Sequence, residues 1–93
     1  MITIHVRYFN FLAAYIGQKS QSLELPDGFT ITDLIHKLAQ EGPPAFREIV
    51  WREDQPNPHL RIFQNDTLVD NNRMKTPLAT GDTIMLFPAI SGG

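Results

Sequence analysis

Apolar and polar residues alternate at the beginning of the chain. In residues 2–8, every second position is apolar or aromatic and the positions between them are polar or charged. A period of two predicts a strand with one buried face. Leu23 and Leu25, on either side of Glu24, repeat this pattern, and residues 26–28, Pro-Asp-Gly, predict the turn that ends the second strand.

The apolar spacing then changes to that of an α-helix. Apolar residues fall at positions i, i+3, i+4, i+7 and i+8: Ile31, Leu34, Ile35, Leu38 and Ala39. This stripe predicts a long helix with one face against a core. Thr30 as the N-cap residue and Asp33 three positions later predict an acidic variant of the capping box. Gly42, which two prolines follow, predicts the end of the helix.

Two shorter helices are predicted, one before and one after the long helix. Residues 9–16 contain good helix formers, and Gly17 can adopt the left-handed conformation that ends a helix. Residues 45–51 place their apolar side chains on one side of a short helix. Residues 52–59 are mostly polar and contain two prolines, so we predict a loop there.

Three strands are predicted in the last third of the chain. Residues 60–64 and 67–69 are two short strands that Asn65-Asp66 joins. Residues 83–87 form the last strand, which follows a turn at Thr80-Gly81-Asp82. The last strand is rich in apolar residues and carries no charge, and this composition predicts a central strand that is buried on both faces.

This order of elements is typical of the ubiquitin-like β-grasp, an α+β fold. We expect a mixed sheet of about five strands, with one long helix across it and one or two short helices. The first and last strands are expected to run parallel at the centre of the sheet. The chain would then form one domain, residues 1–87, and a flexible C-terminal Gly-Gly tail, residues 88–93, that leaves the central strand.

The composition excludes several classes of function. The chain has 93 residues, a formal net charge of -2 and no cysteine. Its basic residues are scattered singly and form no patch of the kind that binds nucleic acid. The lack of cysteine excludes disulfides, thiolate catalysis and cysteine-based zinc sites. We find neither a signal peptide nor an apolar run of roughly 20 residues, so we expect a cytoplasmic protein.

Side chains suited to catalysis are not grouped in the sequence. His5, His36 and His59 lie on different predicted elements and lack the spacing of metal ligands. Glu53 and Asp54 are adjacent and would point apart in an extended loop, so a pair of catalytic carboxylates is not expected. The sequence therefore predicts no metal site and no acid–base catalysis by this chain.

The last two residues offer a different kind of chemistry. Gly92 and Gly93 have no side chains, so this end of the chain could enter a narrow channel and present its carboxylate to another protein's active site. An inert flexible end is the alternative. Phe87 is interpreted equally well as a core residue or as a contact for a partner. Asp82 is predicted to stabilise the turn rather than to contact a partner.

Six segments of the chain follow one another in a recognisable order. They are the strand from Ile2, Phe11-Leu12-Ala13 before Gly17, Leu25-Pro26-Asp27-Gly28, Thr30-Ile31-Thr32-Asp33-Leu34, Leu78-Ala79-Thr80-Gly81-Asp82 and Leu86-Phe87-Pro88-Ala89-Ile90-Ser91-Gly92-Gly93. Together they resemble the MoaD/ThiS family of sulfur carriers. The most specific part is the C-terminal block, in which a Gly-Asp turn, an apolar strand, Phe-Pro and a Gly-Gly end occur in order.

This resemblance implies that the chemistry takes place at the carboxyl group of Gly93. In the family, an E1-like activating enzyme of the MoeB/ThiF type uses ATP and magnesium to adenylate this carboxylate, which a sulfur donor then converts to a thiocarboxylate. The carrier itself binds no cofactor and is a protein substrate rather than an enzyme. The resemblance also implies the residues that contact the partner: Phe87, Pro88, Ile90, Ser91 and Gly92.

Within the family, the chain most resembles the small subunit of molybdopterin synthase, whose tail enters a large subunit of the MoaE type. It departs from that subunit at Ala89, where a second proline is common, and in the long segment 47–59. Both features also resemble the CysO-type carrier of cysteine synthesis. Carriers for thiamine synthesis or tRNA thiolation, a ubiquitin-like protein modifier and a plain interaction module stay open as alternatives.

Overall fold

A computed structural model of the protein describes residues 1–89. Its main sheet has five strands in the order β2-β1-β7-β5-β6, with β1 and β7 parallel at the centre and the other pairs antiparallel. The strands are β1 (Ile2–Tyr8), β2 (Ser20–Leu25), β5 (Arg61–Gln64), β6 (Thr67–Leu68) and β7 (Thr83–Phe87). This mixed sheet confirms the predicted α+β fold and the parallel central pair.

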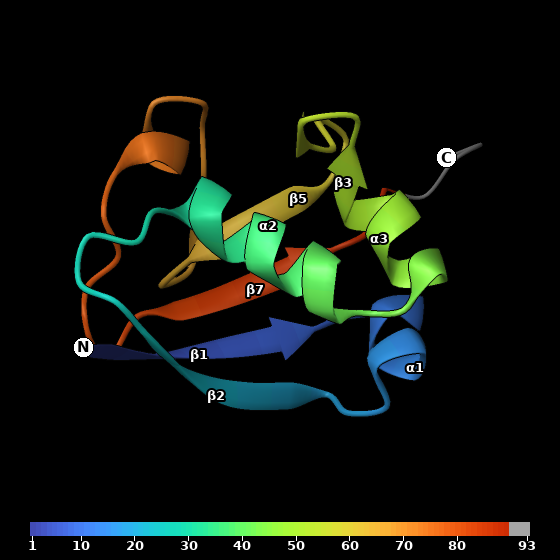
Figure 1. Ribbon diagram of the computed structural model, residues 1–93, viewed down its shortest axis with the longest axis horizontal. Coiled ribbons are helices and arrows are strands. Elements are labelled where there is room, and N and C mark those ends of the chain that lie inside the picture. Colours follow the sequence, from blue (N-terminus) through green and yellow to red (C-terminus); the bar gives the residue numbers. More distant parts are fainter. Residues whose placement is uncertain (90–93) are drawn as a thin grey trace.

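The helices pack on one face and at one end of the sheet. They are α1 (Phe11–Ile16), α2 (Ile31–Glu41), α3 (Pro44–Val50) and the 3₁₀ helix η1 (Arg73–Lys75). Figure 1 shows α2 crossing one face of the sheet, with α1 and α3 at the end to which β1 and β7 point. Among residues 1–89, no helix is long and apolar enough to cross a membrane.

Helix α2 covers the core because its predicted apolar stripe faces the sheet. Ile31, Leu34 and Ile35 are fully buried, and they join the buried residues of β1 and β7 in one core. The capping box predicted from the sequence is present: the backbone N–H of Asp33 donates to Thr30 Oγ1 over 3.1 Å, and the backbone N–H of Thr30 donates to Asp33 Oδ2 over 3.0 Å. The start of the helix is therefore fixed by local hydrogen bonds.

Strand β7 lies between β1 and β5 and is central, as predicted (Figure 1). The expected burial on both faces is wrong, however. Ile84 and Leu86 have no exposed surface, whereas Thr83, Met85 and Phe87 are only half-buried. The physical reason is that successive side chains of a strand point to opposite faces and α2 covers only one of them. The uncharged composition of β7 is therefore not explained by the core alone.

The segment predicted as a loop at residues 52–59 contains a second, two-stranded sheet. Strand β3 (Trp51–Arg52) pairs with β4 (Gln55–Pro56) in an antiparallel ribbon. Its turn includes Glu53 at φ 59, and the Trp51 ring packs against the ring of His36 on α2, with the centroids 4.7 Å apart. The loop prediction missed the ribbon because polar residues and prolines give no strand pattern at residues 52–59.

Candidate partner-binding site

The face of the sheet opposite α2 carries an apolar surface that helices do not cover in the described part of the chain. Strand register places five side chains in one row across this face: Ser20, Arg7, Met85, Phe63 and Leu68. Met85 and Phe63 are half-buried, and Leu68 is 52% exposed. We call the surface formed by Phe9, Phe63, Leu68, Met85 and Phe87 the open face.

Phe87 occupies the end of the open face where β7 stops. Its ring stacks on the ring of Phe9, with centroids 4.1 Å apart and an angle of 13° between the ring planes. The ring of Phe63 packs edge-on against the ring of Phe87, with centroids 5.5 Å apart. The guanidinium of Arg7 lies 5.2 Å from the centroid of Phe9, within the range of a cation–π contact. Phe87 is thus held in place and remains half-buried.

The other residues predicted to contact a partner lie directly after Phe87. Pro88 is buried and Ala89 is exposed. The predictions for Ile90, Ser91, Gly92 and Gly93 fall outside the residues that the structure describes. Of the predicted contact residues, the structure therefore places Phe87 and Pro88, and it brings Phe87 together with Phe9, which follows β1, and with Phe63 on β5.

The opposite end of β7 is fixed by Asp82, which is buried with 8% of its surface exposed. Its carboxylate accepts hydrogen bonds from the backbone N–H of Ala79 over 2.8 Å, from Asn65 Nδ2 over 2.8 Å and from Gln64 Nε2 over 2.9 Å. Burial tends to raise the pKa of Asp82, but these three bonds together outweigh it and hold the pKa below its ordinary value. The prediction that Asp82 stabilises the turn is confirmed.

Several residues of the open face were missed by the sequence analysis. Phe63 and Leu68 pair directly across β5 and β6, and Phe63 pairs with Met85 across β5 and β7. Phe63 and Leu68 could have been placed on one face from hairpin register, because the Asn65-Asp66 turn fixes which residues pair. Arg7 and Phe9 carry no such local signal, because their positions depend on the parallel pairing of β1 with β7.

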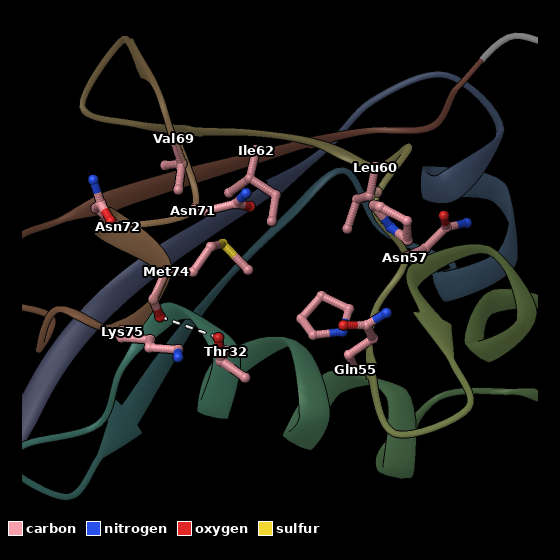
Figure 2. A pocket seen from close by; sticks show the side chains of 12 residues that line it. Thr32, Gln55, Asn57, Leu60, Ile62, Val69, Asn71, Asn72, Met74 and Lys75 are labelled. Atoms are coloured by element: carbon pink, nitrogen blue, oxygen red, sulfur yellow. Dashed lines mark hydrogen bonds between the residues drawn. The ribbon is translucent and has the colours of Figure 1, made fainter.

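Acid–base and metal chemistry find no support in the described residues. Residues 1–89 contain no group of three or more His, Asp or Glu side chains that could hold a metal ion. A cavity of about 570 Å³ lies on the helix side of the sheet, and Figure 2 shows Ile62 and Met74 at its apolar centre, with Gln55, Asn71 and Asn72 around it. Lys75 is the one titratable group that lines it, so the cavity offers no carboxylate and no imidazole.

Comparison with known proteins decides the family. A family model described as the ThiS family matches residues 6–93, which is nearly the whole chain and includes Gly92 and Gly93. The chain belongs to the ThiS family. The predicted resemblance to ubiquitin-like sulfur carriers is thereby confirmed.

Three relatives show which proteins the chain is similar to. Small archaeal modifier protein 3 of Haloferax volcanii is 26% identical over 91 residues, which are 97% of this chain and 98% of that protein. The putative molybdopterin converting factor subunit 1 of Pyrococcus furiosus is 26% identical, with a TM-score of 0.77 over 97% of this chain and 100% of that chain.

The third relative comes from a complex. The protein-protein complex of subunits 1 and 2 of the molybdopterin-converting factor from Helicobacter pylori contains a chain that is 26% identical, with a TM-score of 0.61 over 99% of this chain and 100% of that chain. These ThiS-family relatives are small carrier and modifier proteins rather than catalysts. The family thus includes both carrier proteins and modifier proteins.

Proposed function

We propose that this ThiS-family chain is a sulfur carrier whose Gly93 carboxylate is activated and then converted to a thiocarboxylate. One observation carries the proposal: the match to the family model extends through Gly93, so the Gly-Gly segment belongs to the shared pattern. The central position of β7 supports it, because residues 88–93 follow directly in sequence from the strand that contributes Met85 and Phe87 to the open face.

The chemistry proposed for Gly93 balances without help from a side chain of this protein. The carboxylate oxygen attacks the α-phosphorus of ATP and forms a new P–O bond. The bond to the β-phosphate breaks, and pyrophosphate leaves with its electron pair, which gives an acyl adenylate. Hydrosulfide then attacks the acyl carbon, AMP leaves, and the thioacid loses its proton. ATP and magnesium are bound by the activating enzyme, so this chain needs no cofactor of its own. We place both steps in the cytoplasm.

The described residues position the reacting end rather than react. Gly92 and Gly93 suit a narrow active site because they lack side chains. Phe87 and Pro88, with Ile90 and Ser91, are proposed to contact the partner, and the open face extends that contact across β7, β5 and β6. Half-buried and exposed apolar side chains gathered on one face are typical of a surface that a partner covers.

We propose molybdopterin synthesis as the pathway, with this chain as the small subunit and a MoaE-type large subunit as the second partner after an E1-like enzyme of the MoeB/ThiF type. The likeness to molybdopterin-converting factor subunit 1 from two organisms supports this choice. The complex from Helicobacter pylori also shows that a relative assembles with a second subunit. The carrier would then donate its sulfur to a pterin precursor.

A second candidate function is modification of other proteins. It is favoured by the similarity to small archaeal modifier protein 3, which spans nearly all of both chains. In that function, the amine of a lysine would attack the same activated carbonyl of Gly93 and form an amide as AMP leaves. Both candidates therefore share the adenylate and differ in the nucleophile that takes the acyl group.

Intact-mass spectrometry tests the shared step. The protein ending at Gly93 is incubated with its activating enzyme, ATP, magnesium and sulfide, and we expect a mass gain equal to the replacement of one oxygen by sulfur. A matched variant with one residue added after Gly93 should show no gain. A mass gain in both proteins would refute the proposal. So would the lack of a gain in either protein when the same enzyme preparation activates another carrier.

Two further assays separate the candidate functions. If the thiocarboxylate form makes molybdopterin when it is mixed with a pterin precursor and the large subunit, the first function holds. If lysine-linked conjugates form instead, and disappear when Gly93 is deleted, the modifier function replaces it.

A further inference from the structure

We infer that a basic hollow beside Phe87 receives a carboxylate of the activating enzyme, and that this contact selects the carrier's partner. The basic hollow is the concave surface of about 310 Å³ lined by residues 7–10, Ala13, Lys19 and Ser20. The inference rests on the proposed function, because it takes as its partner the enzyme that activates Gly93. It adds a charged site that family membership does not specify.

The hollow forms where β1 ends, β2 begins and α1 starts. Strand register pairs Arg7 with Ser20, and the backbone N–H of Tyr8 donates to the carbonyl oxygen of Lys19 over 2.8 Å. Arg7 on β1 and Lys19, directly before β2, are therefore held side by side and line the same concave surface. Both residues are exposed, so their charged groups are available to a partner.

The charges of the hollow lack a counter-charge within the described residues. Salt bridges in residues 1–89 join the N-terminus to Asp27 and Lys37 to Glu41, and neither includes Arg7 or Lys19. All the residues that line the hollow are neutral or basic. Glu24 is on β2 but pairs with Thr3 at the other end of β1, about 13 Å along the strand from Arg7 at 3.3 Å per residue. The lining of the hollow therefore carries two positive charges, Arg7 and Lys19, and no negative one.

The hollow is continuous with the open face. The Arg7 guanidinium lies over the ring of Phe9, and Phe9 stacks on Phe87, two residues before the last described residue. On the other side of β7, Arg61 pairs with Phe87 and adds a second positive charge next to that ring. A partner that covers Phe87 thus meets basic side chains on both flanks of β7.

These observations favour an enzyme with acidic residues around the channel that accepts Gly93. A carboxylate accepts hydrogen bonds from a guanidinium in a fixed geometry, and Arg7 is already oriented by its contact with Phe9. The activating enzyme is the partner to which we commit, because it is needed before either proposed use of the carrier. Charged rims of this kind mainly raise association rates and discriminate between partners.

The test measures the affinity of the activating enzyme for four forms of the full chain, wild type and three double variants, by calorimetry without ATP. Arg7→Glu with Lys19→Glu reverses both charges of the hollow, and Arg73→Glu with Lys75→Glu changes the net charge equally at η1, which lies elsewhere in the fold. We expect the first variant to bind at least about tenfold more weakly. The control should bind within about twofold of wild type. Arg7→Lys with Lys19→Arg should retain most of the affinity.

Salt dependence gives a second readout. The affinity of wild type should fall as salt rises, and the affinity of the charge-reversed hollow should lose that dependence. An equal loss of affinity in the hollow variant and in the η1 control would overturn the inference. So would saturable NMR shifts of Arg7 and Lys19 on addition of magnesium-ATP alone, because the hollow would then bind a phosphate rather than the enzyme.

Failure of this inference and failure of the proposed function give different results. If wild type binds the enzyme but ATP–pyrophosphate exchange never occurs, the proposed function fails while the charge contact can still be measured. If exchange occurs with equal affinity and rate for all forms, the proposed function holds and the basic hollow has no part in it. The purified variants are checked for folding by circular dichroism before either measurement.

Discussion

The two faces of β7 are both uncharged but have different environments. On the helix side, Ile84 and Leu86 are completely buried under α2. On the open side, Met85 and Phe87 are only half-buried, although they are as apolar as their neighbours. The comparison shows that an uncharged central strand can serve two purposes, because one face completes the core and the other is left for contact with another protein.

The open side is nevertheless organised. Phe9, Phe63 and Phe87 cover part of one another through stacked and edge-on contacts, which removes some of their surface from water. Such aromatic pairs contribute about 0.5–1.5 kcal/mol beyond burial. The open face is therefore a pre-formed surface, and a partner would not need to rearrange it before binding.

The largest difference between the two faces should appear in stability. Leu86→Ala removes a fully buried side chain and leaves a cavity in the core, which should lower the free energy of unfolding by about 3 kcal/mol. Met85→Ala, one position earlier on the open face, should lower it by about 1 kcal/mol or less. Urea unfolding of both variants measures the difference. Equal losses would show that the two faces are equally part of the core.

A second large effect is expected at the start of β7, where both faces depend on the same turn. Asp82→Asn replaces one carboxylate oxygen by an NH2 group, which cannot accept a hydrogen bond. The side chain can then no longer accept from all three of its donors, Ala79 N–H, Asn65 and Gln64. We expect a loss of about 2 kcal/mol at neutral pH. The same urea series measures it, with Asp66→Asn, an exposed change of the same chemistry, as the matched control.

The pH dependence of that loss follows from the lowered pKa of Asp82. A carboxyl with a lower pKa in the folded than in the unfolded state stabilises the fold above its unfolded value of about 3.9. That contribution is lost as the pH falls through the folded pKa. The difference in stability between wild type and Asp82→Asn should therefore shrink in acid. If the difference in the free energy of unfolding between wild type and Asp82→Asn were the same at neutral and at acidic pH, this prediction would be contradicted.

Local signals predicted most of the fold. Thr30 and Asp33 mark the start of α2 because a capping box uses only neighbouring residues, and residues 83–87 were predicted with the bounds that β7 has. The turn at Asn65-Asp66 was also predicted, and both residues have the positive φ of a tight hairpin. The β3–β4 ribbon was missed because residues 52–59, mostly polar and with two prolines, carry no alternating strand pattern.

The candidate site could be predicted only in part. Phe87 was identified because it precedes the C-terminal segment in the family pattern. Its neighbours Arg7, Phe9 and Phe63 come from β1, the chain after β1, and β5, and they meet only because the strand order is β1-β7-β5. Composition could not reveal which face α2 covers, so both faces of residues 83–87 were predicted to be buried.

A smaller effect on stability and a larger effect on function should be seen at Phe87 itself. Phe87→Ala removes a half-buried ring that contacts Phe9 and Phe63, which should lower the free energy of unfolding by about 1–2 kcal/mol. If the open face binds the activating enzyme, KM for the carrier in ATP–pyrophosphate exchange should also rise at least about tenfold. Phe87→Leu, which keeps an apolar side chain, should recover part of the affinity. An unchanged KM for Phe87→Ala would remove this residue from the interface.

The smallest effect on stability, and hence the cleanest separation of the two faces, is expected at Leu68. This side chain is 52% exposed on the edge strand β6, next to Phe63 in the same row of the open face. Leu68→Ser should change the free energy of unfolding by no more than about 0.5 kcal/mol, because little buried surface is lost. A severalfold rise in KM with unchanged stability would then report contact with the enzyme alone, and Leu68→Met should restore KM. If Leu68→Ser leaves KM unchanged while Phe87→Ala raises it, the interface is limited to the end of β7 and does not extend to the sheet edge.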